Sequence, residues 1–378
     1  MLHIQSALSA TRDTTQAFRE VSVQLHADPA LILFFASTVH SFEQLTVLFR
    51  DTYPNCEVVG VTTTGEIGPQ GFSDQSLSVQ SFAQEFGQIE ALLIDNIEKY
   101  PVFDRNKLMQ SAGKLGIRVE SEHIDKEGLA LIFPTGLVAG EEKMLSIVNS
   151  IFHYDGFPIF GGTAGDDAKF VQTIVSLNGR QSSKGGVVVF IKPNLDFYIQ
   201  KENIFTSTGI TLKITKADAE KRIVYEINHE PATKVYARAL GVSEQQLPQY
   251  FMTNPLGRRF NEEVLIASPF QVEANGALAF YCQVFQDAVV ELLEPKDPVQ
   301  TLQNTLVEFT SKFDKLEGVL ACNCILRKLQ FQEQHLFPAL NSQLSQLPNL
   351  AGFSSYGEQL NKSLINQTLL LIGFGKRG

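Results

Sequence analysis

Short apolar runs alternate with amphipathic stretches along much of this chain. Apolar runs bounded by glycine and polar residues predict buried strands, and apolar residues at helical spacing predict helices. Read in this way, the order strand, helix, strand, strand occurs three times, so one module is used repeatedly. The predicted strands of the three modules are Leu31–Ala36, Val58–Thr62 and Leu77–Ala83; Leu129–Pro134, Ile159–Thr163 and Gly185–Ile191; and Gly318–Leu326, Gly352–Ser355 and Leu369–Gly375.

A shared turn closes the middle strand of each module. The first copy, Glu57–Glu66, reads EVVGVTTTGE, and the last, Leu350–Glu358, reads LAGFSSYGE. Both contain an apolar residue, Gly, any residue, two Ser or Thr, any residue, Gly and Glu. A shorter version, PIFGGTAGD, occupies Pro158–Asp166. We call these segments the signature turns, and the pattern predicts that they have comparable structures.

The signature turns are also candidates for a binding pocket. A strand, helix, strand unit of this length forms a parallel crossover, and ligands on parallel sheets collect at the carboxyl ends of the strands. The residues placed to contact a ligand there are Thr62, Thr64, Glu66, Tyr356 and Glu358. The alternative interpretation is that glycine serves a tight turn and the hydroxyl groups satisfy the backbone.

The rest of the chain completes the predicted architecture. Residues 1–25 are expected to hold a helix. After residue 200 the pattern changes to alternating apolar positions, which predict two strands around a charged turn. We therefore predict an α/β fold with mixed sheets, built from repeated strand-helix-strand-strand modules. An N-terminal domain of two modules, residues 1–195, would pack against a C-terminal domain, residues 196–378.

Composition narrows the class of protein. The 378 residues are 44% hydrophobic, carry a net charge of −10, and contain no basic tract. That argues against nucleic acids and anionic lipids as partners. No apolar run approaches the roughly 20 residues that span a bilayer, and the N-terminus lacks the pattern of a secretory signal. Four cysteines without a disulfide spacing favour a reducing compartment. We expect a cytoplasmic protein.

Several motifs, in this order, resemble the FIST domains, in both their N-terminal and C-terminal parts. They are GVTTTGEI, FPIFGGTAGDD, EPATKVYARALG, CILRKLQ, AGFSSYGEQ and NQT, and they extend over nearly the whole chain. The resemblance implies a bacterial sensory protein that binds a small ligand. Stand-alone members of this size resemble haem-binding nitric-oxide sensing proteins. These act on a partner histidine kinase, and through it on cyclic-di-GMP or quorum-sensing output. A homodimer is a further expectation.

If haem is the cofactor, its iron needs an axial ligand in an apolar cavity, most often a histidine. His40 directly follows the strand Leu31–Ala36 and would lie at its carboxyl end, so it is the preferred metal ligand, ahead of His335 and His153. The alternative role for His40 is that of a residue at the start of a helix near Ser41.

A second hypothesis dispenses with haem. Arg327 is expected near a strand end, where it could pair with Glu358 or hold the carboxylate of a ligand. In the second case the chain would sense an amino acid or another small metabolite. Cys322 and Cys324 lie two residues apart on a predicted strand, either as a redox-sensitive pair or as small buried apolar groups.

Enzyme signatures are missing from the sequence. It contains no GxSxG elbow, no P-loop and no HExxH. The carboxylates at the signature turns, which include Asp166 and Asp167, could form an acid and base pair of a hydrolase or isomerase if they converged. Because nothing in the sequence shows that these carboxylates converge, we predict a sensor and not an enzyme.

Overall fold

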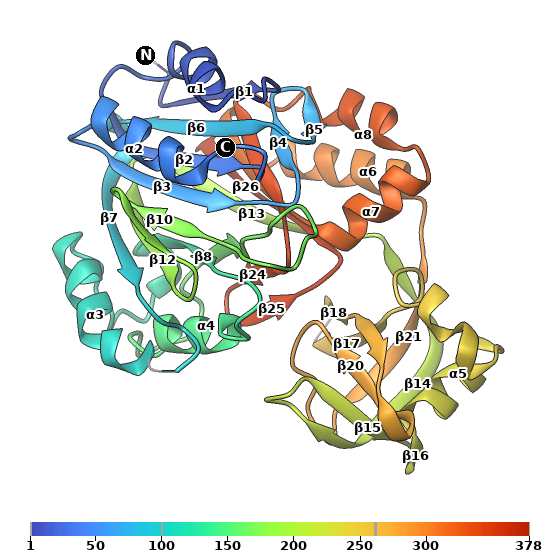
Figure 1. Cartoon of the computed structure of the whole chain (residues 1–378). Helices are drawn as coiled ribbons and strands as arrows, with labels where there is room; N and C mark the ends of the chain where they lie inside the picture. Colours follow the sequence, from blue (N-terminus) through green and yellow to red (C-terminus); the bar gives the residue numbers. More distant parts are fainter. Residues whose placement is uncertain (1, 100, 261–262, 378) are drawn as a thin grey trace.

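The computed structural model describes residues 2–99, 101–260 and 263–377. The described strands form three six-stranded sheets and one eight-stranded sheet. The three six-stranded sheets belong to one body, which we call the core. The fourth sheet belongs to an inserted domain, residues 205–295, which lies beside the core at the lower right of Figure 1. The predicted α/β fold with mixed sheets is confirmed.

The three core sheets share one strand order, which is the structural counterpart of the sequence repeat. The first sheet runs β1 (Ile4–Ser9), β6 (Leu77–Ala83), β2 (Pro29–Ala36), β3 (Glu57–Thr62), β10 (Val175–Leu177) and β11 (Arg180–Ser182). The second runs β7 (Gly87–Ile94), β12 (Gly186–Pro193), β8 (Leu129–Pro134), β9 (Ile159–Gly162), β24 (Glu358–Leu360) and β25 (Ser363–Ile365). The third runs β13 (Asp196–Asn203), β26 (Thr368–Lys376), β22 (Lys315–Cys324), β23 (Leu350–Ser355), β4 (Glu66–Gly68) and β5 (Gly71–Ser73).

In each sheet the first two strands of a module pair in parallel, as β2 does with β3, β8 with β9 and β22 with β23. The predicted middle strands are therefore confirmed as β3, β9 and β23, and each lies between two neighbours. The boundary expected at residues 195 and 196 falls in the turn between β12 and β13.

The last two strands of each sheet come from a different module. The β4–β5 hairpin follows β3 along the chain but pairs beside β23. The β10–β11 hairpin follows β9 and pairs beside β3. The β24–β25 hairpin follows β23 and pairs beside β9. This exchange is cyclic, so each module completes the sheet of another and no module can complete its sheet alone.

The inner faces of the three sheets share one hydrophobic centre. On β2, Leu31, Leu33 and Phe35 point into it, while the alternate residues pack towards helices. Strands covered on both faces read as continuous apolar runs, which explains LILFFA. Rings from the three sheets meet there, since Phe35 lies 4.8 Å from Phe353 and 6.1 Å from Phe133 between ring centroids.

Helices cover the outer faces of the sheets. The first sheet packs against α1 (Thr14–Ser22) and α2 (Phe42–Thr52), the second against α3 (Arg105–Lys114) and α4 (Glu141–Asn149), and the third against α6 (Pro298–Thr310) and α8 (Phe337–Leu344). The helix α7 (Ile325–Glu333) follows β22 directly. Short 3₁₀ turns occupy Gln84–Phe86, Pro101–Asp104, Ile124–Lys126, Glu244–Gln249 and Ala274–Gly276.

The helix predicted over residues 1–25 is only partly correct. The chain begins with β1, which pairs with β6, and the helix α1 begins after its N-cap Asp13. The segment IQSALS has little strand propensity of its own, so pairing with the neighbouring strand decides its conformation.

The inserted domain is a sheet with one helix. Its strands are β18 (Glu263–Ala267), β17 (Leu256–Phe260), β21 (Val289–Pro295), β14 (Phe205–Asp218), β15 (Ile223–Ile227), β20 (Leu278–Phe280) and β19 (Pro269–Val272), with β16 (Glu230–Pro231) beside β15. The predicted strand pair around a charged turn is confirmed as β14 and β15. The helix α5 (Ala232–Leu240) ends at Gly241 in a left-handed conformation.

Close approach of the paired strands β8 and β9 depends on a glycine in β9. Gly161→Ala should lower the free energy of unfolding by about 3 kcal/mol, since overpacking against backbone is costly. The added Cβ would lie 1.9 Å from the carbonyl oxygen of Ile132. Gly113→Ala in α3 is the control, since nothing lies within 4 Å of its Cβ and alanine favours a helix by up to about 1 kcal/mol. Urea unfolding of both variants measures the difference. A Gly161→Ala protein as stable as the parent would contradict this explanation.

Candidate functional site

The three signature turns meet at the centre of the core in a closed ring of backbone hydrogen bonds. Thr64 donates to the Ser354 carbonyl over 3.0 Å, Tyr356 to the Thr163 carbonyl over 3.1 Å, and Gly165 to the Thr62 carbonyl over 2.8 Å. Within this ring each turn donates to one neighbour and accepts from the other. Two further bonds run in the reverse direction, from the Thr163 N–H to the Gly357 carbonyl and from the Ser354 N–H to the Gly65 carbonyl. The turns are therefore comparable, as predicted, and they are held together by one another.

Two buried glutamates organise their own turns in the same way. Glu66 accepts hydrogen bonds from the Thr63 hydroxyl and from both the backbone N–H and the hydroxyl of Ser76. Glu358 accepts from the Ser355 hydroxyl at 2.7 Å, and from the backbone N–H and hydroxyl of Thr368 at 3.2 and 2.7 Å. Each glutamate thus ties its signature turn to the start of the next long strand of the same module.

The middle turn departs from this pattern because neither of its carboxylates binds the start of the next long strand of its module. Asp166 accepts the backbone N–H groups of Phe170, Val171 and Gln172, and also the hydroxyl of Tyr356. Asp167 accepts from the backbone N–H and hydroxyl of Thr38 and from the Ser37 hydroxyl. These two residues therefore connect the middle turn to the other two modules.

The side chains of Thr62 and Thr64 are also used within the protein. The Thr62 hydroxyl donates to the Ile174 carbonyl and accepts the Ile174 N–H, and the Thr64 hydroxyl donates to the Ser354 carbonyl. Both residues are buried, as are Glu66 and Glu358. The structure thus brings the predicted turn residues together, and their polar groups are occupied by protein partners.

Burial changes the acidity of both glutamates. Loss of solvent raises the pKa of Glu66 to about 7, although the bonds from Ser76 and Thr63 oppose that rise. Burial also raises the pKa of Glu358 to about 7, against the bonds from Thr368 and Ser355. Each carboxyl therefore takes up a proton more readily in the folded protein than in the unfolded chain.

A pH dependence of stability follows. Because a raised folded-state pKa favours the proton-bound folded form, the free energy of unfolding should fall as pH rises from about 4.5 to 7, by up to roughly 3 kcal/mol per carboxyl. Glu66→Gln and Glu358→Gln, which cannot titrate, should each remove one part of that slope. Urea unfolding between pH 5 and pH 8 measures it, and a slope unchanged in both variants would contradict this assignment.

His40 lies in the turn between β2 and α2, as expected from its position after the first strand. Its side chain is 4% exposed, and neither ring nitrogen has a hydrogen-bond partner in the described part of the chain. Burial lowers the pKa of His40, although Asp167 and Asp13 favour the proton. The ring is therefore held towards its neutral form. In contrast, His153 and His335 are exposed.

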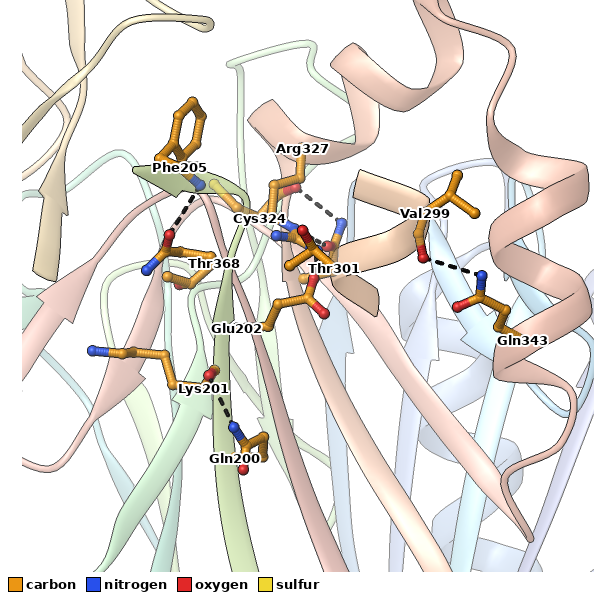
Figure 2. A network of polar contacts seen from close by, with 12 residues as sticks. Gln200, Lys201, Glu202, Phe205, Val299, Thr301, Cys324, Arg327, Gln343 and Thr368 are labelled. Carbon is orange, nitrogen blue, oxygen red and sulfur yellow. Dashed lines mark hydrogen bonds and ion pairs between the residues drawn. The ribbon is translucent and has the colours of Figure 1, made fainter. Parts of the chain in front are cut away.

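Arg327 lies in the first turn of α7 and pairs with Glu202 of β13, not with Glu358 (Figure 2). Its Nε donates to the Asn323 side chain over 3.0 Å, and its guanidinium lies 5.1 Å from the centre of the Phe331 ring. Both members of the pair are buried. Removing either one would leave a buried charge uncompensated, at a cost of about 3–5 kcal/mol, so the pair fixes α7 against the third sheet.

Cys322 and Cys324 are buried free thiols on β22. Cys322 packs in the shared centre of the core, and Cys324 belongs to a small apolar cluster with Ile325 and Leu326. Burial raises the pKa of both thiols. Protonated buried thiols are poor nucleophiles and poor metal ligands. The two cysteines are therefore packed as small buried apolar groups and are not placed as a redox-sensitive pair.

A cleft of about 510 Å³ lies between the core and the inserted domain. We call it the interdomain cleft. Its size falls within the roughly 300–1,000 Å³ of small-molecule sites. The core contributes one wall from α4 and the β24–β25 turn, namely Glu142, Ser146, Asn149, Ser150, Lys362, Ser363 and Leu364. The inserted domain contributes Arg258, Leu265, Ile266, Ala267, Cys282, Gln283, Val284, Phe285, Ala288 and Val290.

Polar contacts hold the two walls of the interdomain cleft together. Arg222 of the inserted domain pairs with Glu141 at 2.9 Å and with Glu142 at 2.5 Å, both at the start of α4. The backbone N–H of Gln283 also donates to Glu142 over 3.1 Å. Since these contacts link the two bodies directly, the shape of the cleft depends on how the inserted domain sits on the core.

A second cavity, of about 990 Å³, has mainly polar walls beside β13. It is lined by charged groups such as Asp125, Lys126, Lys192 and Arg377. Small-molecule sites are lined mostly by apolar groups with a few placed polar ones, and the interdomain cleft fits that description better.

Comparison with protein families identifies the chain. A model described as the FIST N domain matches residues 30–230, and one described as the FIST C domain matches residues 232–361. The chain belongs to the FIST family. FIST domains are signal-sensing domains, and the family is a sensory one and not an enzyme family. No curated protein matches the chain.

The two family matches meet at residue 231, inside the inserted domain and at the end of β16. A sensory family implies a ligand and a signalling partner. None of the described helices has the length and apolar character needed to cross a membrane.

Sequence reasoning missed the interdomain cleft. Its lining residues come from distant segments, and none belongs to a signature turn. One signal was the Arg258-Arg259 doublet. On a strand, adjacent residues face opposite sides, so one of the two arginines had to point away from the other. That pattern alone does not show which side is a cavity.

Proposed function

We propose that this FIST protein senses a small organic molecule bound in the interdomain cleft and passes its bound state to a signalling partner. The observation that carries the proposal is that the two walls of the cleft come from separate bodies of the chain. A ligand that contacts both walls favours one arrangement of the inserted domain over others. That arrangement is what a partner would recognise.

The meeting point of the signature turns is less suited to a ligand in this conformation. The ring of backbone hydrogen bonds closes it, and the hydroxyl and carboxyl groups of Thr62, Thr64, Glu66 and Glu358 bond to protein atoms. Only Tyr356 is partly exposed, where it stacks on Phe170 with ring centroids 5.1 Å apart. These residues support the ligand site by fixing the core.

Occupancy of the interdomain cleft can be tested by filling it. We expect at least one of 4-phenylbutyrate, 4-phenylbutanol and 4-phenylbutylamine to raise the melting temperature of the parent protein. A ligand at 100 times its Kd stabilises the folded state by about 2.7 kcal/mol. Ala288→Trp, which places an indole in the cleft, should abolish that shift.

The control is Ala10→Trp, at an exposed position far along the chain from the residues that line the cleft. It should keep the shift of the parent. If no probe stabilises the parent, or if Ala288→Trp responds as the parent does, the cleft is not the ligand site.

A finer form of the proposal is that the ligand is haem and that the protein senses nitric oxide. It is supported by the resemblance to haem-binding nitric-oxide sensing proteins and by the unpartnered imidazole of His40. The partner would then be a histidine kinase with cyclic-di-GMP or quorum-sensing output. Bound haem would supply an iron that takes up the gas, and His40 would hold it through one ring nitrogen.

The structure satisfies only part of this finer proposal. A neutral imidazole with two free nitrogens suits iron, but His40 is nearly fully buried and lines neither of the two cavities described above. Haem would reach it only after the turn at residues 37–41 moved.

Titration with haemin tests the finer proposal directly. The parent protein should develop a Soret band that shifts with nitric oxide, and His40→Ala should lower haem retention or move the band, with an unchanged far-ultraviolet circular dichroism spectrum. His153→Ala and His335→Ala, both at exposed positions, are the controls. A parent spectrum retained in His40→Ala but lost in a control would show that another histidine binds the iron. A parent protein without a Soret band would remove haem from the proposal.

A further inference from the structure

We propose that the interdomain cleft selects an organic anion with an apolar body, and that Arg258 recognises its negative charge. The inference rests on the proposed function of the cleft as the ligand site, and it adds the chemical class of the ligand and the residue that selects it.

Arg258 is a cation without a counter-ion. It lies on β17, half-buried, and lines the cleft together with Leu265, its partner across the β17–β18 pair. No carboxylate forms an ion pair with it in the described part of the chain. Its neighbour Arg259 is exposed and forms an ion pair with Glu291 at 3.1 Å. One strand therefore presents a paired guanidinium outside the cleft and an unpaired one towards it.

The other charged side chains that line the cleft, Glu142 and Lys362, each take part in an ion pair. Glu142 shares Arg222 with Glu141 and accepts the Gln283 N–H. Lys362 pairs with Asp155 on the core. Arg258 is therefore the one cation lining the cleft that forms no ion pair in the described structure. A carboxylate suits this position because guanidinium binds it through two parallel hydrogen bonds.

The rest of the lining suits an apolar body on that anion. Most lining residues of the inserted domain are apolar, namely Leu265, Ile266, Ala267, Val284, Phe285, Ala288 and Val290. Leu364 adds an apolar side chain from the core, and Ser146, Asn149 and Ser150 supply neutral polar groups on α4. One unpaired cation beside apolar side chains is typical of a site for one carboxylate on a hydrocarbon or aromatic frame.

The absence of tryptophan from the sequence gives a clean reporter. Phe285→Trp places one indole at the rim of the cleft, where Phe285 is 48% exposed. We expect 4-phenylbutyrate to change its emission with a saturable dependence on concentration. 4-Phenylbutanol and 4-phenylbutylamine carry the same apolar body with neutral and positive ends, and they should bind at least tenfold more weakly.

Arg258→Gln in the Phe285→Trp background should weaken 4-phenylbutyrate binding by roughly 10- to 100-fold, the loss of one charge-assisted contact. The alcohol should bind this variant and its parent equally, which separates lost recognition from lost folding. Arg259→Gln is the matched control, because it removes the same charge from the opposite face of the same strand and should leave the affinity for the acid unchanged.

The outcomes distinguish the two proposals. If the alcohol or the amine binds as tightly as the acid, or if Arg258→Gln binds the acid as tightly as its parent, selection of an anion by Arg258 is wrong although the cleft remains the ligand site. If Arg259→Gln weakens binding as much as Arg258→Gln, the effect is one of overall charge and the assignment to Arg258 is wrong. If none of the three probes changes the emission, both proposals are wrong.

Discussion

The closed ring of backbone hydrogen bonds among the three signature turns is the constraint on which the core depends. One of its donors is Gly165, where an added Cβ would lie 2.4 Å from Cγ2 of Thr64. Inside the middle strands, Gly161 and Gly352 would each place a Cβ 1.9 Å from a carbonyl oxygen of the paired strand. The hydroxyl groups and buried glutamates then hold each turn in position for its neighbour. The motif that identifies the family is thus explained by packing and backbone geometry, without a ligand.

Much of this core could be predicted from the sequence because its signals are local. Buried strands such as LILFFA, and the repeated turn, are readable from short segments. The order of the modules then gives the parallel pairs. The exchange of the hairpins could not be predicted in this way, because nothing in the three-residue strands β4 or β10 shows which sheet they join. Pairing partners far apart in sequence are decided by the whole fold.

The candidate site shows the same division between local and distant information. The position of His40 at a strand end followed from its neighbours in sequence, and so did the grouping of the turn residues. The partner of Arg327 did not, since Glu202 lies in another module and a buried charge takes whichever partner the packing supplies. The interdomain cleft has walls from α4, β17 and the loop after β20, so it exists only in the assembled molecule.

The cyclic exchange of hairpins also carries information about origin and synthesis. A single module that lent its hairpin to a neighbouring copy would close into a homotrimer with the same three sheets, so a symmetric trimer joined into one chain is a direct route to this architecture. During translation, the second sheet must wait for β24 and the third for β26, which are made after most of the other core strands. Until those strands are made, the incomplete sheet edges are the part of the nascent chain that most needs protection from aggregation.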